Sequence, residues 1–192
     1  MFEEINLGLY LSGVGIAIAA FILLILFEII KCRAEKQKSS GQNPFFLIGS
    51  ILLITGWVLA AFACKRSTQL VLLFGIIILA VGLFLYFLVL RETSADHTYT
   101  QKGQEKKVYT DGCYGIIRHP GLWCFLIVSI GAELIVPALL PGNVLFVILN
   151  TIYIFLQDKI FFPIYLQGYT EYRKNVPFCI PDWDKLRTKR SV

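Results

Sequence analysis

Residues 70–90 read LVLLFGIIILAVGLFLYFLVL and carry no charged side chain. An α-helix needs about 20 apolar residues to cross a bilayer, so this stretch predicts a membrane-spanning helix. A chain in lipid must satisfy its own backbone hydrogen bonds, so the other apolar stretches are expected to be helical too. Those stretches are Leu7–Ile30, Phe45–Cys64, Gly121–Leu140 and Val144–Phe162. We therefore expect an all-α membrane bundle of about five transmembrane helices.

The composition agrees with this class. Hydrophobic residues make up 56% of the chain, charged residues only 16%, and the mean hydropathy is +0.67. A soluble domain has roughly 45–50% apolar and about 25% charged residues. The net charge of +5 does not indicate a nucleic-acid partner, because the cations flank the apolar stretches and suit lipid headgroups.

The cysteines predict neither a metal centre nor a disulfide framework. They show no CxxC spacing, and no histidine lies at metal-ligand spacing from them. The five are Cys32, Cys64, Cys113, Cys124 and Cys179. The first residues, Met-Phe-Glu-Glu, have no basic segment and no small-residue cleavage site, so we expect no removable signal peptide.

The distribution of Lys and Arg predicts the orientation in the membrane. The segments after the first and third spans and the C-terminal part from Lys159 carry sixteen of the 18 Lys and Arg, and the connection after the second span carries the other two. By the positive-inside rule, the N-terminus is expected outside and the C-terminus in the cytoplasm.

Candidate functional residues lie where the polar middle of the chain meets the fourth span. Residues 112–123 read GCYGIIRHPGLW. Pro120 suits the first turn of a helix, so the span is expected to start there with His119 just outside it. The guanidinium of Arg118 and the helix N-terminus both favour an anionic ligand. An arginine at a membrane boundary is also often only a topology anchor, and that alternative stays open.

The fourth and fifth spans are expected to form an antiparallel hairpin. Pro141, Gly142 and Asn143 predict its turn. The hairpin would bring Asp158 close to Arg118, and we expect a cytoplasmic pocket between these corners that is also open to lipid. Two acidic residues lie inside the expected spans. Glu28 is interpreted as a boundary residue, and Glu133 either faces the bundle interior or reaches the far interface.

An ordered set of motifs between about Lys106 and Pro181 resembles a family of integral membrane methyltransferases. This family includes isoprenylcysteine carboxyl methyltransferase and the phospholipid methyltransferases. The matching residues are Gly112-Cys113-Tyr114, Arg118-His119-Pro120, Gln157-Asp158, Tyr169-Thr170-Glu171-Tyr172-Arg173 and Val176-Pro177-Phe178-Cys179-Ile180-Pro181. Three positions depart from the family pattern: Leu122 replaces a Tyr, Gln157 an acidic residue and Lys106 a His.

The resemblance implies an enzyme that transfers a methyl group from S-adenosylmethionine to a membrane-borne acceptor. That acceptor would be a lipid or a lipid-linked molecule with a carboxylate or an amine. The resemblance implies that Arg118 holds the acceptor and acts in catalysis. The positions that it implies for cofactor binding are Lys106, Val108, Tyr109, Tyr114, His119, Pro120, Gln157 and Asp158.

The chain is expected to be a single membrane domain. Three spans reach to residue 91, the methyltransferase-like core covers residues 92–181, and residues 182–192 form a basic tail. The alternative function is a non-catalytic membrane binding or scaffold protein that keeps the methyltransferase fold. A relative of the membrane sterol reductases is disfavoured by the length of the chain. The sequence does not indicate an oligomeric state.

Overall fold

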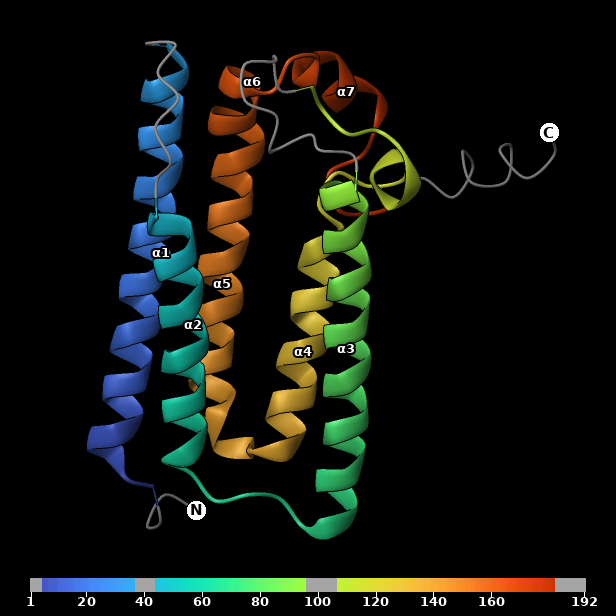
Figure 1. The fold of residues 1–192 in the computed structure, drawn as a ribbon. Helices are drawn as coiled ribbons and strands as arrows, with labels where there is room; N and C mark the ends of the chain where they lie inside the picture. Colours follow the sequence, from blue (N-terminus) through green and yellow to red (C-terminus); the bar gives the residue numbers. More distant parts are fainter. Residues whose placement is uncertain (1–4, 37–43, 96–106, 182–192) are drawn as a thin grey trace, which may run out of the picture.

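The computed structural model describes residues 5–36, 44–95 and 107–181, and within them the chain is all-helical (Figure 1). Five helices are long: α1 (Leu7–Lys36), α2 (Phe45–Phe62), α3 (Gln69–Ala95), α4 (Pro120–Ile135) and α5 (Leu140–Leu156). The shorter elements are the 3-10 helices Gly112–Gly115 and Pro137–Leu139, the π-helix Gln157–Phe161, α6 (Phe162–Tyr165) and α7 (Tyr169–Asn175). The expected fold class, a helical membrane bundle, is confirmed.

Within the described residues, four helical segments are long and apolar enough to cross a membrane. They are Leu7–Ala34, Phe45–Phe62, Gln69–Glu92 and Pro137–Tyr165. The last of these runs from the 3-10 helix Pro137–Leu139 through α5 and the π-helix to the end of α6. The helix α4 is shorter, with 16 residues. At 1.5 Å per residue it extends about 24 Å, less than the roughly 30 Å of a bilayer core.

The turn between the fourth and fifth spans is not where the sequence predicted it. The helix α4 ends at Ile135, and the chain reverses through Val136 and the 3-10 helix Pro137–Leu139. Pro141 instead lies in the first turn of α5, where its missing N–H costs nothing. Gly142 is also helical, and a Cβ there would lie 3.0 Å from the Tyr10 hydroxyl. The small size of Gly142 allows this close packing against α1. Because Pro141 and Gly142 both lie within α5, the predicted turn was wrong.

Small residues let two helix pairs approach closely. A Cβ on Gly56 of α2 would lie 2.5 Å from the carbonyl oxygen of Gly13 in α1, too close for any side chain. A Cβ on Gly131 of α4 would lie 2.5 Å from the amide nitrogen of Leu79 in α3. Small-residue contacts of this kind are typical of helix pairs in membranes, where lipid-like side chains gain little from burial.

The helix α5 and an aromatic contact join the two pairs. Phe21 of α1 and Phe146 of α5 belong to one buried cluster. The rings of Trp57 in α2 and Phe125 in α4 stack with centroids 5.6 Å apart. The outer faces stay apolar and exposed, as expected for lipid contact: Phe62 of α2, for example, is 71% exposed.

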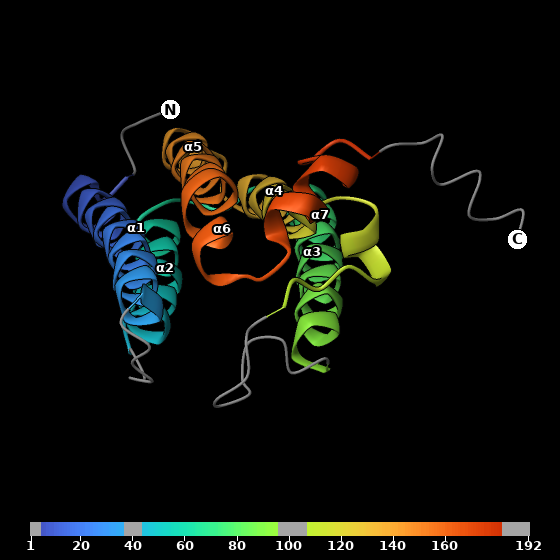
Figure 2. The same cartoon turned by 90° about the horizontal axis from the view of Figure 1, so that it is seen from above.

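The two ends of the bundle differ. Residues 107–119, α6 and α7 lie across one end, with α6 beside the C-terminal part of α1, and we call this the capped end (Figure 2). At the opposite end, the Ser67 amide donates to the Ile135 carbonyl at 2.9 Å, which joins the connection after α2 to the α4–α5 turn. The motif residues within the described ranges all lie at the capped end.

Candidate functional site

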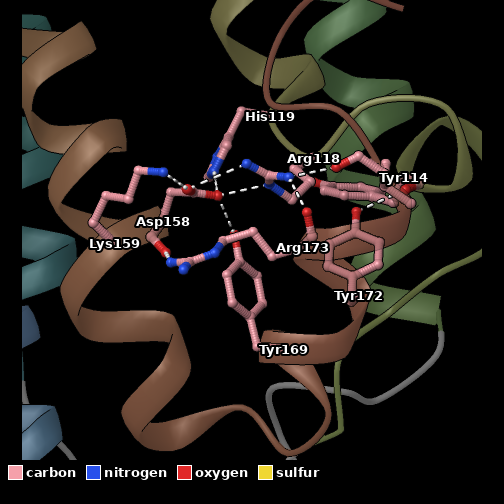
Figure 3. Close-up of polar contacts among 9 residues, drawn as sticks. Tyr114, Arg118, His119, Asp158, Lys159, Tyr169, Tyr172 and Arg173 are labelled. Carbon is pink, nitrogen blue, oxygen red and sulfur yellow. Dashed lines mark hydrogen bonds and ion pairs between the residues drawn. The ribbon is translucent and has the colours of Figure 1, made fainter. Parts of the chain in front are cut away.

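Arg118 and Asp158 meet at the capped end, as the sequence predicted (Figure 3). The Arg118 Nε donates to Asp158 Oδ1 at 2.7 Å, and Nη2 donates to Asp158 Oδ2 at 3.3 Å. Arg118 directly precedes His119 and α4, whereas Asp158 belongs to the π-helix that follows α5. The hairpin therefore brings together two charged residues that are 40 positions apart in the sequence.

Pro163 explains why α5 widens into a π-helix at Asp158. A proline has no N–H to donate to the carbonyl four residues before it, here that of Lys159, and its ring crowds that carbonyl. A π-turn moves the carbonyl out of the way, and single π-turns often occur at functional sites. The widened turn holds Asp158 fully buried, with no exposed surface.

Arg118 also fastens the segment after α7. Its Nη1 donates to the carbonyl oxygens of Arg173, at 2.8 Å, and of Val176. The Arg118 amide donates to the Pro177 carbonyl at 3.0 Å, and the His119 amide donates to the Phe178 carbonyl at 3.3 Å. Four of the five guanidinium N–H groups are thus used within the protein. Among contacts with the described residues, one N–H of Nη2 has no acceptor.

His119 lies against the same carboxylate. Its Nε2 is 3.4 Å from Asp158 Oδ1, and its ring stacks on Phe162 at a centroid distance of 5.9 Å. Burial lowers the pKa of His119 below the ordinary histidine value, and the contact with Asp158 offsets this only in part. The imidazole is therefore neutral at pH 7, and Nε2 carries the proton if it donates to Asp158. Pro120 follows at the first position of α4, as predicted.

Tyr169 and two further cations complete the contacts of Asp158. The Tyr169 hydroxyl donates to Asp158 Oδ1 at 2.8 Å. The Lys159 Nζ lies 3.7 Å from Oδ2, and the Arg173 Nη1 is 3.4 Å from the Asp158 backbone carbonyl. Burial, followed by the hydrogen bond to Asp158, raises the pKa of Tyr169 above the ordinary tyrosine value.

The loop residues that the resemblance implies pack beside this cluster. The Val108 amide donates to the Gln167 carbonyl at 3.1 Å, which places the loop against the segment between α6 and α7. The rings of Tyr109 and Tyr114 meet edge to face with centroids 5.7 Å apart. The Tyr172 hydroxyl donates to the Tyr114 carbonyl at 2.6 Å. Lys106, also implied for the cofactor, lies outside the described residues, as does the basic tail.

Gln157 contacts a different acidic residue from its neighbour Asp158. The Gln157 amide donates to Glu28 of α1 at 2.7 Å. The hydroxyls of Tyr153 and Tyr165 donate to the same carboxylate at 3.1 and 2.8 Å. Glu28 is only 2% exposed, so its interpretation as a boundary residue was wrong. Glu28 accepts hydrogen bonds from side chains before, within and after the π-helix. The sequence signal for such a buried network was an acidic residue inside an apolar span.

Glu133 belongs to a polar network at the opposite end of the bundle. Its Oε2 accepts a hydrogen bond from the Asn143 side-chain amide at 3.0 Å, and the Asn143 Oδ1 accepts one from the Trp57 indole at 2.7 Å. Glu133 was predicted either to face the bundle interior or to reach the far interface, and its contact with Asn143 of α5 corresponds to the first of these.

The space between Arg118 and Asp158 is not the predicted pocket. The two side chains touch, both are buried, and Tyr169 and His119 fill the remaining sides of the carboxylate. A ligand would have to bind beside this pair or displace one of its contacts. Most residues of the predicted site are thus brought together, but Gln157 contacts Glu28 instead, and the arrangement around Asp158 is closed.

No family model matches the chain, and comparisons with curated proteins and with solved structures give no significant match either. The likeness to the membrane methyltransferases therefore rests on the motif residues alone.

Proposed function

We propose that this protein is an S-adenosylmethionine-dependent methyltransferase that acts on a membrane-borne lipid or lipid-linked acceptor. The observation that supports the proposal is the convergence of three separate motifs. Arg118, Asp158 and Tyr169 come from different segments of the chain, and Arg118 and Tyr169 both donate to the Asp158 carboxylate, at 2.7 and 2.8 Å. The hairpin alone accounts for the approach of Arg118 to Asp158, so the contact that adds support is that of Tyr169, which comes from α7.

The chemical types of the clustered groups fit parts of the methyl donor. Tyr109 and Tyr114 offer aromatic surface for the adenine ring. Asp158 and Gln157 offer a carboxylate and an amide for the ammonium group and the ribose hydroxyls of S-adenosylmethionine. Both side chains already have partners within the protein, so this fit requires that at least one of them changes partner. S-adenosylmethionine supplies a methyl group activated by a sulfonium sulfur.

The chain itself would supply position. Methyl transfer is an in-line displacement: the bond from carbon to sulfur breaks as the bond to the acceptor oxygen or nitrogen forms, and alignment provides most of the acceleration. The acceptor needs a pair of electrons at that atom. A carboxylate already has one, whereas an ammonium group must first lose a proton. His119 is the imidazole base of the cluster, and to take up that proton it would need relief from the burial that lowers its pKa.

The direct test is methyl transfer in membranes from cells that produce the full chain. These membranes are incubated with S-adenosylmethionine labelled in the methyl group, and the lipids are extracted and separated. We expect a labelled lipid with the wild-type protein and with the surface control Glu171→Ala, and at least a 100-fold lower yield with Asp158→Asn. Folding of each variant is checked by thermal unfolding. A folded wild-type protein that labels no lipid would refute the enzyme proposal.

One observation favours the alternative, a non-catalytic binding or scaffold protein. The Arg118–Asp158 pair is closed by the protein's own groups and has the contacts of a structural clamp. In that case the same membranes label no lipid, and the purified protein shows no affinity for S-adenosylmethionine.

A further inference from the structure

The outer face of α5 carries a row of exposed apolar residues along its whole length. The members are spaced three or four positions apart, which puts them on one side of the helix. Each is about half exposed: Leu140 is 55%, Val144 50%, Ile148 50%, Ile152 48% and Phe155 51% exposed. Four residues after Phe155, on the same side, comes Lys159, whose side chain is 45% exposed. We call this set the α5 stripe.

The stripe ends at a surplus of positive charge. Arg118 and Lys159 contact the carboxylate of Asp158, and Arg173 contacts its backbone carbonyl, so in this described cluster three cations lie beside one anion (Figure 3). Arg118 holds the short contact at 2.7 Å. Lys159 has only a long contact of 3.7 Å, and Arg173 reaches a backbone carbonyl at 3.4 Å. Lys159 and Arg173 thus have longer contacts within the protein than Arg118 has.

We propose that the α5 stripe with Lys159 and Arg173 is a binding site for an anionic phospholipid. An acyl chain lies along the apolar part, and the phosphate of the headgroup lies at the two cations. Phosphate oxygens suit an arginine fork and a lysine ammonium, and cations at the end of a span lie at the depth of the headgroups. Phe155 links the two parts, because the Lys159 Nζ lies 5.7 Å from its ring centroid.

The occupant is a lipid because the apolar stripe and the cations are continuous. A soluble phosphate would use only the cations and leave the stripe to bulk lipid. The site goes beyond the proposed function, since it uses neither the methyl donor nor a methyl acceptor, and its test does not involve turnover.

The test is native mass spectrometry of the purified full chain in detergent. Short-chain phosphatidylglycerol and phosphatidylcholine with identical acyl chains are titrated, and the lipid-bound fraction is measured. We expect phosphatidylglycerol to bind at least 10-fold more tightly than phosphatidylcholine. The double variant Lys159→Gln/Arg173→Gln should lose this preference, and Lys159→Arg/Arg173→Lys should keep most of it. Equal binding of the two lipids by the wild-type protein would overturn the proposal.

Two controls separate this site from general attraction. Lys174→Gln removes a nearby exposed cation that pairs with Glu171 at 2.8 Å, and it should leave the preference unchanged. If it weakens binding as much as the double variant, the effect is surface charge and the proposal fails. Phe155→Ser should weaken phosphatidylglycerol binding, and 10 mM inorganic phosphate should not displace the lipid. Full displacement by phosphate with no effect of Phe155→Ser would identify a soluble-anion site and overturn the lipid assignment.

Discussion

Replacing Asp158 by Ala should destabilise the protein strongly, because Asp158 is the common partner of the buried groups at the capped end. Its loss leaves the Arg118 guanidinium buried without a counter-charge and removes the acceptor of the Tyr169 hydroxyl. Breaking a buried ion pair by removing one partner costs about 3–5 kcal/mol. The lost hydrogen bond from Tyr169 is part of the same network, so its cost does not simply add.

Thermal unfolding of the purified chain in one detergent measures this effect. For a chain of this size, 1 kcal/mol shifts Tm by about 2–4 °C, so we expect Asp158→Ala to lower Tm by about 6–20 °C. Glu171→Ala is the matched control, because Glu171 is exposed and pairs only with exposed groups. Its Tm should match that of the wild type, because substitutions at exposed positions of this kind have little effect on stability.

A double variant separates the ion pair from other effects at this position. Replacing both partners by apolar residues, as Arg118→Met/Asp158→Leu, removes the unpaired charge and should recover much of the lost stability. If Asp158→Ala unfolds within 2 °C of the wild type, then Arg118 is not held by a buried partner, and the description of the capped end is incorrect.

Three further predictions concern single side chains. Glu28→Leu should lower the free energy of unfolding by about 2–4 kcal/mol, since three side-chain donors lose their acceptor. Glu28→Gln should lower it by less than half of that. Denaturant titration measures both changes. His119 has a lowered pKa, so the unfolded chain takes up a proton that the folded chain does not. Stability should therefore fall as the pH drops below about 6.5, by at most about 1.4 kcal/mol per pH unit, and His119→Asn should remove this component of the slope. Burial, reinforced by the hydrogen bond to Glu92, raises the pKa of Cys113 to about 12. Alkylation of Cys113 by iodoacetamide at pH 8 should then be about 10³-fold slower in the folded chain than in the unfolded chain. It should be faster in folded Glu92→Gln than in the folded wild type. Equal rates in the folded and unfolded wild-type chains would contradict the buried contact.

Apolar length and proline position made much of the fold predictable. Long apolar stretches must be helical in lipid, and Pro120 lies where it suits a helix start, so α3 and the beginning of α4 follow from the sequence. The same reasoning failed at Pro141, because a proline after an apolar run suits either a turn or the first turn of the next helix. The deciding contact, between Gly142 and Tyr10 of a distant helix, is invisible in the local pattern.

The meeting of Arg118 with Asp158 was predictable, but its details and the partner of Gln157 were not. The hairpin fixes that Arg118 and Asp158 come near each other, whereas the direct contact depends on a π-turn that sets the direction of Asp158. Glu28 was misjudged because the sequence of α1 is apolar around its whole circumference. No periodicity marks its buried face, so the three donors that meet Glu28 could not be foreseen.

Equilibrium binding of S-adenosylmethionine to the purified full chain in lipid nanodiscs tests the proposed function most directly. Calorimetric titration is compared between the wild type, Asp158→Asn and the control Glu171→Ala. The account predicts saturable binding of one molecule per chain, weakened at least 10-fold by Asp158→Asn and unchanged by Glu171→Ala. A folded wild-type protein that gives no binding heat at millimolar S-adenosylmethionine, or binding that is indifferent to Asp158→Asn, would contradict it.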